Sequence, residues 1–382
     1  MTGTPQIEER SERDVDSSWY DAAPGTWLPA STLDGAPLER IRLPDSKKRS
    51  RTQIYYDGVV EVCRRPHPGP QVVQMLTNMR PNALPWLRQL KNDGSAIMYS
   101  VSQYPTWPQK PIKRLFRGRG YRKVFNEFDA LVTNSETIEG FLRDIGVTTR
   151  VEYIPNGVNL QRFHPVQTED EAAARQAMRA RFGIPEDAKV IAMVGAVQPR
   201  KSPDQVIRAW RLLLEQHPDL HLLFVGPRAD THDPKLQEFG QEIKTLIDES
   251  PAPGQVHFAG IVDNVQDYLR AADLFVLASK REGTPNSVLE AMATGLPALV
   301  TPYIGISAGI GTAGEHYQLV ERKPEAIAEA FRGLLADPEG ARALAERGRN
   351  FVLEKADQQK SLDRYAALYE ELAAMALKRR QG

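Results

Sequence analysis

The stretch from residue 272 to 301 constrains the fold of this chain more than any other. It contains an apolar run, a polar loop, a short helical segment and a second apolar run. Pro285 suits the first turn of the helix, and Gly295 suits its end. A strand, a loop, a helix and a second strand in this order are typical of an open parallel sheet, in which the loop and the helix start face the ligand crevice.

Two carboxylates flank the start of this short helix. Glu282 lies in the loop after the first strand, and Glu290 lies within the helix. Carboxylates accept hydrogen bonds from sugar hydroxyls, and the amino end of a helix offers N–H donors to phosphate. The pattern therefore predicts a site for a sugar that is joined to phosphate.

Strands and helices alternate along most of the chain. Apolar runs bounded by turn residues predict strands at 59–62, 71–76, 96–101, 130–135, 151–154, 190–194, 222–225, 256–259, 274–277 and 298–300. Strands that alternate with helices form parallel sheets covered on both faces, so two α/β halves are expected. A last helix, expected from 358 to 378, has apolar residues at helical spacing and needs a surface to cover, for which the first half is the candidate.

Length and composition narrow the function classes. With 382 residues, 41% of them hydrophobic and 26% charged, the chain is long enough for two or three domains of a globular protein. The formal net charge of zero indicates no nucleic-acid partner, and the single Cys63 excludes an internal disulfide framework or a cysteine-ligated zinc site. No apolar run approaches the roughly 20 residues of a membrane span, and residues 1–50 lack a signal-peptide core, so a cytoplasmic protein is expected.

A second constellation follows the first strand of the second half. Gly195 ends that strand, and Arg200 and Lys201 stand just before the next helix. Arg offers a planar fork to phosphate oxygens, Lys a compact charge, and the helix end a partial positive charge. Alone, such a pair is more typical of an exposed loop. On the same sheet as the 282–290 segment, it predicts a diphosphate site.

Short motifs succeed one another in a fixed order from residue 130 to 380. They are Glu282 and Glu290 with seven residues between them, the helix that continues to Pro297, the basic loop 194–201, Val225-Gly226, and the segments 256–260, 271–274 and 156–163. Two glutamates at this spacing are a weak signal, but the ordered set is specific. It resembles the retaining glycosyltransferases of family 4, with their E-x7-E signature and basic loop.

The resemblance implies the GT-B fold, an α/β architecture of two facing Rossmann-like domains with a cleft between them. The expected parts are a weakly ordered or irregular segment at 1–50, an acceptor-side domain at 51–165, a nucleotide-sugar-binding domain at 166–355, and a C-terminal helix at 356–382 that crosses back to the first domain.

The resemblance also implies a function. The enzyme would move a sugar from a UDP- or GDP-sugar to an unidentified acceptor with retained configuration, in polysaccharide, glycolipid or glycoconjugate synthesis. Arg200 and Lys201 would hold the diphosphate, Glu290 would accept from the ribose hydroxyls, and Glu282 would contact hydroxyls of the transferred sugar. No metal or other cofactor is implied, because protein cations would stabilise the charge on the leaving diphosphate.

The matching positions define the candidate site. Glu282 is assigned to position the sugar and not to act as general base, because the family's front-face mechanism gives the acceptor proton to the leaving phosphate. The catalytic candidates are Arg200, Lys201 and Glu282. The donor-binding candidates are Gly195, Arg200, Lys201, Glu282, Gly283, Thr284, Pro285, Asn286, Ser287, Val288 and Glu290.

The first domain departs from the family's pattern. Residues 1–50 contain no Gly-Gly loop, and no histidine ends the strands expected at 71–76 and 96–101. Ser102 and Gln103 stand at the end of the second of these strands and are the candidates for sugar or acceptor contacts. A truncated or remodelled first domain is therefore expected. A catalytically weak or inactive GT-B protein, which binds a nucleotide sugar or supports a partner transferase, is the alternative function.

A basic stretch lies in the first half. Lysines and arginines at positions 110, 113, 114, 117, 119, 122 and 123 have apolar residues between them. Such a stretch suits peripheral contact with the inner face of an anionic membrane, a site for an anionic acceptor, or a solvated helix face. The sequence leaves these three interpretations open.

Overall fold

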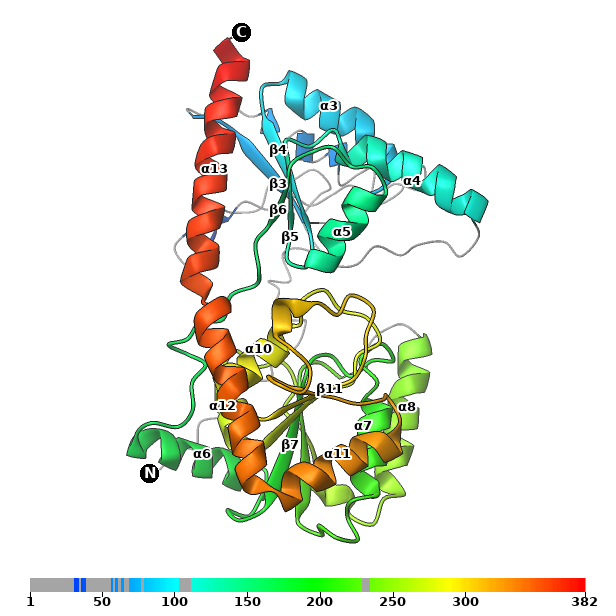
Figure 1. Cartoon of the computed structure of the whole chain (residues 1–382), viewed down its shortest axis with the longest axis vertical. Helices are drawn as coiled ribbons and strands as arrows, with labels where there is room; N and C mark the ends of the chain where they lie inside the picture. Colours follow the sequence, from blue (N-terminus) through cyan, green and yellow to red (C-terminus); the bar gives the residue numbers. More distant parts are fainter. Residues whose placement is uncertain are drawn as a thin grey trace.

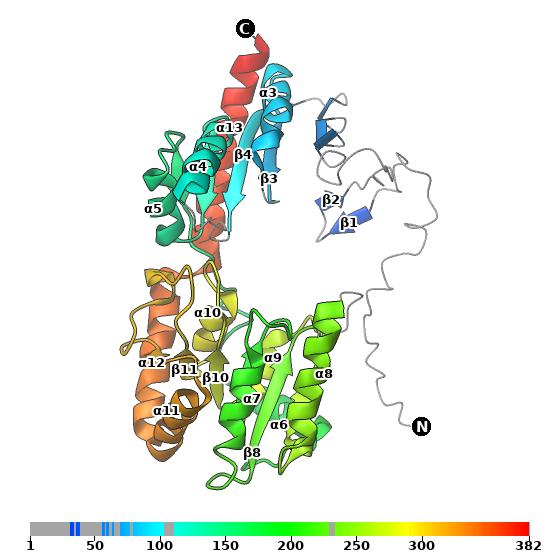
Figure 2. The same cartoon turned by 90° about the vertical axis from the view of Figure 1, so that its right-hand side faces the viewer.

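The computed structural model describes residues 31–33, 36–38, 56–57, 59–60, 63–64, 69–76, 79–102, 111–228 and 234–381. Two α/β units lie one above the other, and the C-terminus ends beside the upper, N-terminal unit (Figure 1 and Figure 2). Each unit is built on a parallel sheet. This confirms the expected α/β architecture of two domains.

The second unit contains six parallel strands in the order β12-β11-β10-β7-β8-β9. This is the doubly wound Rossmann order, in which the direction of winding reverses between the first and fourth strands, here β7 and β10. The strands are β7 (Lys189–Val194), β8 (Leu220–Val225), β9 (Val256–Phe258), β10 (Leu274–Leu277), β11 (Ala298–Val300) and β12 (Gln318–Leu319).

Helices cover both faces of this sheet, because successive strand residues enter two different apolar cores. Val190 and Ala192 pack in the core under α9, α10 and α12, whereas Ile191 and Met193 pack in the core under α7, α8 and α11. The helices are α6 (Glu169–Arg181), α7 (Pro203–Arg211), α8 (Pro234–Asp248), α9 (Val265–Ala271), α10 (Asn286–Ala293), α11 (Pro324–Ala336) and α12 (Pro338–Lys355), with 3-10 turns η3 (Pro253–Gln255) and η4 (Ala308–Ile310).

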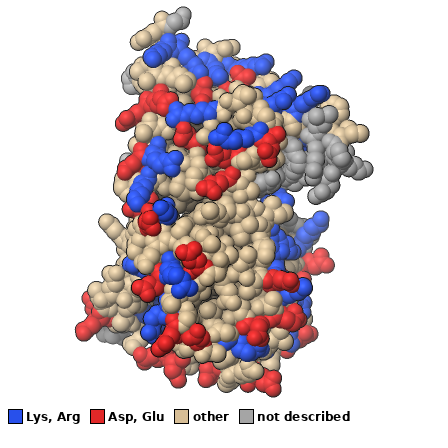
Figure 3. Space-filling view, in the orientation of Figure 1, with Lys and Arg blue, Asp and Glu red and all other residues tan. Residues whose placement is uncertain are grey.

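The first unit contains four parallel strands in chain order, β3 (Val72–Met75), β4 (Ala96–Val101), β5 (Ala130–Thr133) and β6 (Val151–Tyr153). Consecutive right-handed crossovers place their helices on one face of such a sheet. These helices are α3 (Leu84–Asn92), preceded by η2 (Pro81–Ala83), α4 (Pro111–Phe125) and α5 (Glu136–Asp144), and a separate hairpin pairs β1 (Ser31–Leu33) with β2 (Ala36–Leu38). Lys and Arg side chains gather over α4, at the upper right of the molecule (Figure 3).

The C-terminal helix α13 (Gln358–Gln381) covers the other face of the first sheet (Figure 1). Leu368 and Leu372 are buried against Met98 and Val132 of that sheet. The expected return of the C-terminal helix to the first domain is therefore confirmed. The end of the chain supplies an apolar layer on the face opposite the connecting helices.

One local prediction is wrong. Val59 and Val60, expected in a strand, are helical. Tyr56 and Val60 lie four residues apart and are both buried in the core of the first unit, and this packing at helical spacing outweighs the strand preference of valine. Helix α4 continues without a break through Gly118 and Gly120.

Two segments join the units and run side by side. Val158 N donates a hydrogen bond to Ala356 O at 2.8 Å, and Gln358 N donates to Val158 O at 3.1 Å. The segment that enters the second unit is therefore hydrogen-bonded to the segment that leaves it.

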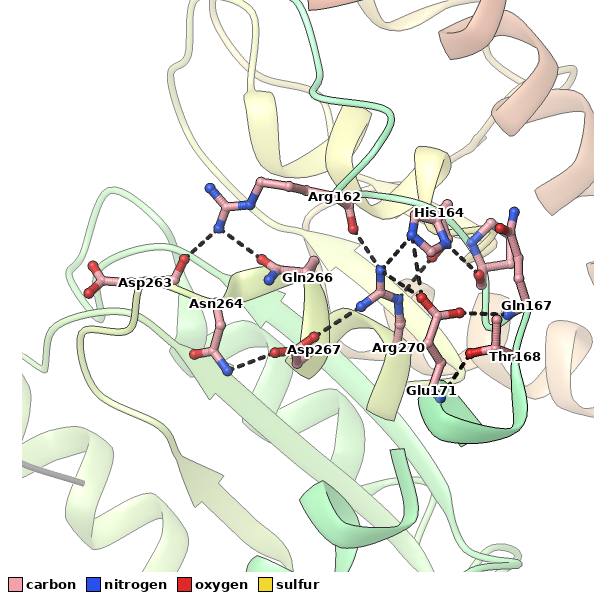
Figure 4. A network of polar contacts seen from close by, with 11 residues as sticks. Arg162, His164, Gln167, Thr168, Glu171, Asp263, Asn264, Gln266, Asp267 and Arg270 are labelled. Atoms are coloured by element: carbon pink, nitrogen blue, oxygen red, sulfur yellow. Dashed lines mark hydrogen bonds and ion pairs between the residues drawn. The ribbon is translucent and has the colours of Figure 1, made fainter. Parts of the chain in front are cut away.

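Arg270 on α9 fixes the end of the entering segment to the second unit (Figure 4). Its Nη2 donates to Arg162 O at 2.8 Å, and its Nε donates to His164 O at 3.2 Å. Ion pairs with Asp267 at 3.0 Å and Glu171 at 3.6 Å hold the guanidinium in place. Any hinge between the two units would therefore lie on the N-terminal side of Arg162 in this segment.

Candidate functional site

The carboxyl ends of β7 and β10 meet where the winding of the second sheet reverses. Ligands of doubly wound sheets bind in the crevice outside this point. The loop 195–202 leaves β7 there, and the loop 278–285 leaves β10. Most of the residues that the sequence nominated lie on these two loops and on α10.

Arg200, Lys201 and Glu282 form one cluster at this point. Glu282 Oε1 accepts hydrogen bonds from Lys201 Nζ at 2.7 Å and from Arg200 Nη1 at 3.1 Å. The side chains of Lys201 and Glu282 are each 12% exposed, whereas that of Arg200 is 40% exposed. The fold thus brings together three candidates that are far apart in the sequence, and it places the carboxylate in direct contact with both cations.

Hydrogen bonds to main-chain oxygens hold these loops against each other. Lys280 N donates to Arg200 O at 2.8 Å, and Arg200 Nη1 donates to Arg281 O at 2.8 Å. Glu282 N donates to Ile304 O at 3.1 Å in the loop after β11. The positions of the carboxylate and of the cations are therefore fixed by backbone contacts as well as by their own pairing.

The turn between β7 and α7 has an unusual backbone. Gly195 has a φ of 141°, and a Cβ there would lie 3.2 Å from Lys201 Cε. Ser202 has a φ of 52°, which is uncommon for a residue with a side chain, and its buried hydroxyl has no hydrogen-bond partner in the described part of the chain. Such strain persists where neighbouring contacts fix the backbone, and here it accompanies the orientation of Lys201 toward Glu282.

Glu290 lies within α10, the helix that follows the loop 278–285, and its environment differs from that of Glu282. Burial raises the pKa of Glu290 above its ordinary value, and Arg162 partly offsets that rise. Its carboxylate has no ion pair or hydrogen-bond donor among the residues that the structure describes. A carboxylate that is shielded from water and unpaired favours hydroxyl donors, because they stabilise its charged form without a second ion.

The amino end of α10 has no side-chain cap. Pro285 is the cap residue, and its carbonyl accepts from Val288 N at 3.1 Å. The N–H groups of Asn286 and Ser287, at the first turn, have no main-chain partner within the helix. Unpaired amides at the start of a helix favour an anion.

Two asparagines of the first unit hold the loop that leads into α10. Asn156 Nδ2 donates to Thr284 O at 3.1 Å and to Asn286 Oδ1 at 2.5 Å. Asn134 Nδ2 donates to Asn156 Oδ1 at 3.0 Å, and Thr284 Oγ1 donates to Asn134 O. Sequence reasoning missed both asparagines, although each lies within a few residues of the carboxyl end of a strand, the edge that faces the crevice.

Gly283 lies against the end of β4. A Cβ on Gly283 would lie 2.2 Å from Ser102 O, so the two main chains are in contact. The side chain of Ser102 is exposed, and Gln103 lies outside the described residues. Of the two first-domain candidates, Ser102 is therefore the one that the structure places at the crevice.

Tyr303 is a second residue that sequence reasoning missed. It lies in the loop after β11 and is buried in the core of the second unit. Burial raises its pKa well above the ordinary value, and nearby Tyr317 and Glu282 raise it further. Its buried hydroxyl lacks a hydrogen-bond partner in the described structure. The signal available in the sequence was a loop that departs from the family's usual pattern.

Other features lie apart from this crevice. Within the described ranges, no three His, Cys, Asp or Glu side chains lie together in a way that would hold a metal ion. No helix in those ranges has the length and apolarity needed to cross a membrane. A pocket of about 370 Å³ opens at the opposite, amino edge of the second sheet, where Lys189, Leu274 and Pro297 line it. The cluster around Glu282 does not line that pocket.

Two family descriptions match this chain. Residues 174–351 match Glycosyl transferases group 1, and residues 98–162 match Glycosyltransferase Family 4. The matched segments together span more than half of the chain and contain strands of both sheets. The chain is therefore similar to these glycosyltransferase families in both of its units.

Relatives and solved structures agree with this similarity. The chain is 27% identical to EpsD of Bacillus subtilis over 287 residues, which are 74% of this chain and 71% of EpsD. It is 33% identical to the D-inositol 3-phosphate glycosyltransferase of Salinispora tropica over 241 residues, which are 60% of this chain and 48% of that protein. The chain therefore spans about half the length of this second relative.

The structure of Anabaena HepE in complex with UDP and glucose resembles the structure of this chain with a TM-score of 0.69. The likeness covers 88% of this chain and 86% of HepE at 16% sequence identity. At such an identity the likeness shows the fold alone. The expected GT-B fold is confirmed.

Proposed function

We propose that this protein is a glycosyltransferase that moves a sugar from a UDP- or GDP-sugar to an acceptor hydroxyl with retained configuration. The observation that carries the proposal is the cluster of two cations and one carboxylate at the reversal point of the second sheet, beside the amino end of α10. The HepE structure, of the same fold, contains UDP and glucose. A nucleotide sugar presents the phosphate and hydroxyl groups that these side chains bind.

Each part of the donor has a proposed partner. Arg200 and Lys201 bind the diphosphate together with the free amides of α10. Glu290, unpaired and partly buried, accepts from the ribose hydroxyls, and Glu282 accepts from hydroxyls of the transferred sugar. Ser102 lies on the acceptor side. The remaining donor contacts are Gly195, Gly283, Thr284, Pro285, Asn286, Ser287 and Val288.

The proposed chemistry uses the protein's own cations. The bond between the anomeric carbon and the phosphate oxygen breaks, and the acceptor oxygen bonds to the same carbon from the same face. The departing diphosphate takes the acceptor's proton. Arg200 and Lys201 stabilise the negative charge that develops on the diphosphate, so the proposal includes no metal or other cofactor.

Release of nucleoside diphosphate from a panel of UDP- and GDP-sugars tests this function. Because removal of one preorganised charge partner typically costs roughly 100- to 1000-fold in kcat, we expect Arg200→Ala and Glu282→Ala to lower release steeply. Arg208→Ala is the matched control, since Arg208 lies nearby on α7 but pairs with Glu242 at 3.7 Å. No release by the wild type with any donor and acceptor would contradict the proposal.

The alternative is a GT-B protein that binds a nucleotide sugar with little or no turnover. The absence of histidine at the ends of β3 and β4 favours it, because the resembling enzymes place a histidine there against the sugar. Donor binding in a calorimeter without release of nucleoside diphosphate would support this alternative.

We also propose that α4 contacts an anionic membrane. Ile112 and Phe116 are 72% and 66% exposed, and they share a helix face with Arg119 and Lys123 because the spacings are four, three and four residues. These two cations, with Arg117 and Arg122, have no carboxylate partner in the described chain; Figure 3 shows the basic surface. Exposed apolar side chains beside unpaired cations favour a lipid surface over a merely solvated helix.

Sedimentation with vesicles tests this contact. We expect binding to vesicles of phosphatidylglycerol and phosphatidylcholine, weak binding to pure phosphatidylcholine, and a loss of binding in a double Ile112→Ser, Phe116→Ser variant. Leu212→Ser, at an exposed position of the second unit, is the control. If the double variant raises the KM for an anionic acceptor while no form binds vesicles, α4 is an acceptor site instead.

A further inference from the structure

A single oxygen of Glu282 accepts hydrogen bonds from both cations of the cluster, Arg200 and Lys201. The proposed function assigns Arg200 and Lys201 to the diphosphate and Glu282 to the transferred sugar. In the structure these three side chains bind one another, through hydrogen bonds of 2.7 Å and 3.1 Å to Glu282 Oε1. A diphosphate that reaches the same N–H donors must therefore displace this oxygen.

The pairing is a fixed feature of the site and not a loose surface contact. The side chains of Lys201 and Glu282 are each 12% exposed, so water screens their attraction less than it would at an open surface. Lys280 N bonds to Arg200 O, and Glu282 N bonds to Ile304 O, which fixes the backbone on both sides of the pair. The Glu282 carboxylate therefore occupies the position to which Arg200 and Lys201 would strongly attract phosphate oxygens.

We infer that Glu282 is an internal anion that competes with the diphosphate for Arg200 and Lys201, and that it thereby favours the intact donor over the product nucleoside diphosphate. This inference rests on the proposed function. When a donor binds, the displaced carboxylate gains the hydroxyls of the transferred sugar as new hydrogen-bond donors. When the nucleoside diphosphate binds alone, those hydroxyls are missing and the carboxylate stays close to the phosphate charge.

The competition has a consequence for the reaction cycle. After transfer, the sugar leaves with the acceptor, and Glu282 loses its hydroxyl partners. Its return to Arg200 and Lys201 restores two charge-assisted hydrogen bonds and weakens the hold on the diphosphate. Glu282 thus assists product release in addition to its contact with the sugar.

Binding of inorganic pyrophosphate, which needs no base or sugar, tests the competition directly by calorimetry. We expect Glu282→Gln to bind pyrophosphate about tenfold more tightly than the wild type, since a hydrogen bond to a charged group contributes enough for such a factor. Glu290→Gln, which removes the same charge without a contact to either cation, is the matched control and changes the affinity by less than about twofold. Lys201→Gln weakens binding.

Equal or weaker pyrophosphate binding by Glu282→Gln would overturn the inference. Glu282→Asp is the second variant, because its shorter carboxylate keeps the charge but reaches the cations less well. Its affinity should lie between those of the wild type and Glu282→Gln. Thermal unfolding of each variant checks that every pyrophosphate affinity is measured on folded protein.

A second measurement separates this inference from the proposed function. The ratio of donor affinity to UDP or GDP affinity should fall in Glu282→Gln, because product binding tightens and donor binding loses its sugar contact. If pyrophosphate binds more tightly to Glu282→Gln but no nucleotide sugar is turned over by the wild type, the internal anion stands and the proposed function fails. If the wild type turns over and the affinity ratio is unchanged, the function stands and the inference fails.

Discussion

Asn156→Ala would test how far the first unit controls the donor loop. The Asn156 amide donates two hydrogen bonds across the crevice, to Thr284 O and to Asn286 Oδ1. A typical intramolecular hydrogen bond contributes about 1 kcal/mol net, so the two bonds favour the observed contact between the units by about 2 kcal/mol. The bond from Thr284 Oγ1 to Asn134 O would remain.

A loss of about 2 kcal/mol from the arrangement in which both units meet the donor corresponds to about 30-fold in kcat/KM. The assay is release of nucleoside diphosphate at low donor concentration. Asn159→Ala is the control, because among the described residues its side chain accepts only from Gln161 N and Arg162 N of its own segment. If Asn156→Ala retains kcat/KM within about twofold of the wild type, or if Asn159→Ala loses as much, the amide does not position the loop.

Further predictions concern stability. Leu372→Ala on α13 should lower the free energy of unfolding by about 3 kcal/mol, because Leu372 is 1% exposed against the first sheet; Leu377→Ala, 43% exposed, should change it little. Thermal melts of both variants measure this difference, and equal shifts would contradict the covering role of α13. Burial lowers the pKa of His257 to about 4, and His221, whose Nδ1 lies 2.9 Å from His257 Nε2, adds to the effect. The unfolded chain therefore takes up a proton near pH 6.5 that the folded chain refuses, so stability should fall as pH drops from 6.5 towards 4. His257→Gln should flatten that slope in urea titrations, and an unchanged slope would refute the assignment.

The strands of the second unit were predictable because they are buried on both faces. Such strands are nearly continuous apolar runs, so their positions can be read without knowledge of their neighbours. The strands found at Leu274–Leu277 and Ala298–Val300 have the expected bounds. The helical conformation of residues 56–57 and 59–60 was not predictable in this way, because the spacing of the buried Tyr56 and Val60 becomes visible only when the core they enter is known.

The candidate site was also predictable only in part. The order of strands and helices predicts which loops lie at the carboxyl edge of the sheet, so the loops after β7 and β10 could be nominated together. The contacts of Asn134 and Asn156 could not be predicted, because they join two units whose relative placement is not encoded in any local pattern. The buried hydroxyl of Tyr303, which has no hydrogen-bond partner among the described residues, could not be predicted either, because it depends on the packing around it.

The sequence by itself determined the residue types at the crevice: two cations after β7, and one carboxylate before and one within α10. It did so because chain order and apolar periodicity specify which edge of a parallel sheet each loop occupies. Only the tertiary structure decided that Arg200 and Lys201 meet on a single oxygen of Glu282, while Glu290 makes no ion pair among the described residues. Those distances depend on the strained turn at Ser202 and on the backbone bonds between loops, which no spacing of residues in the sequence specifies.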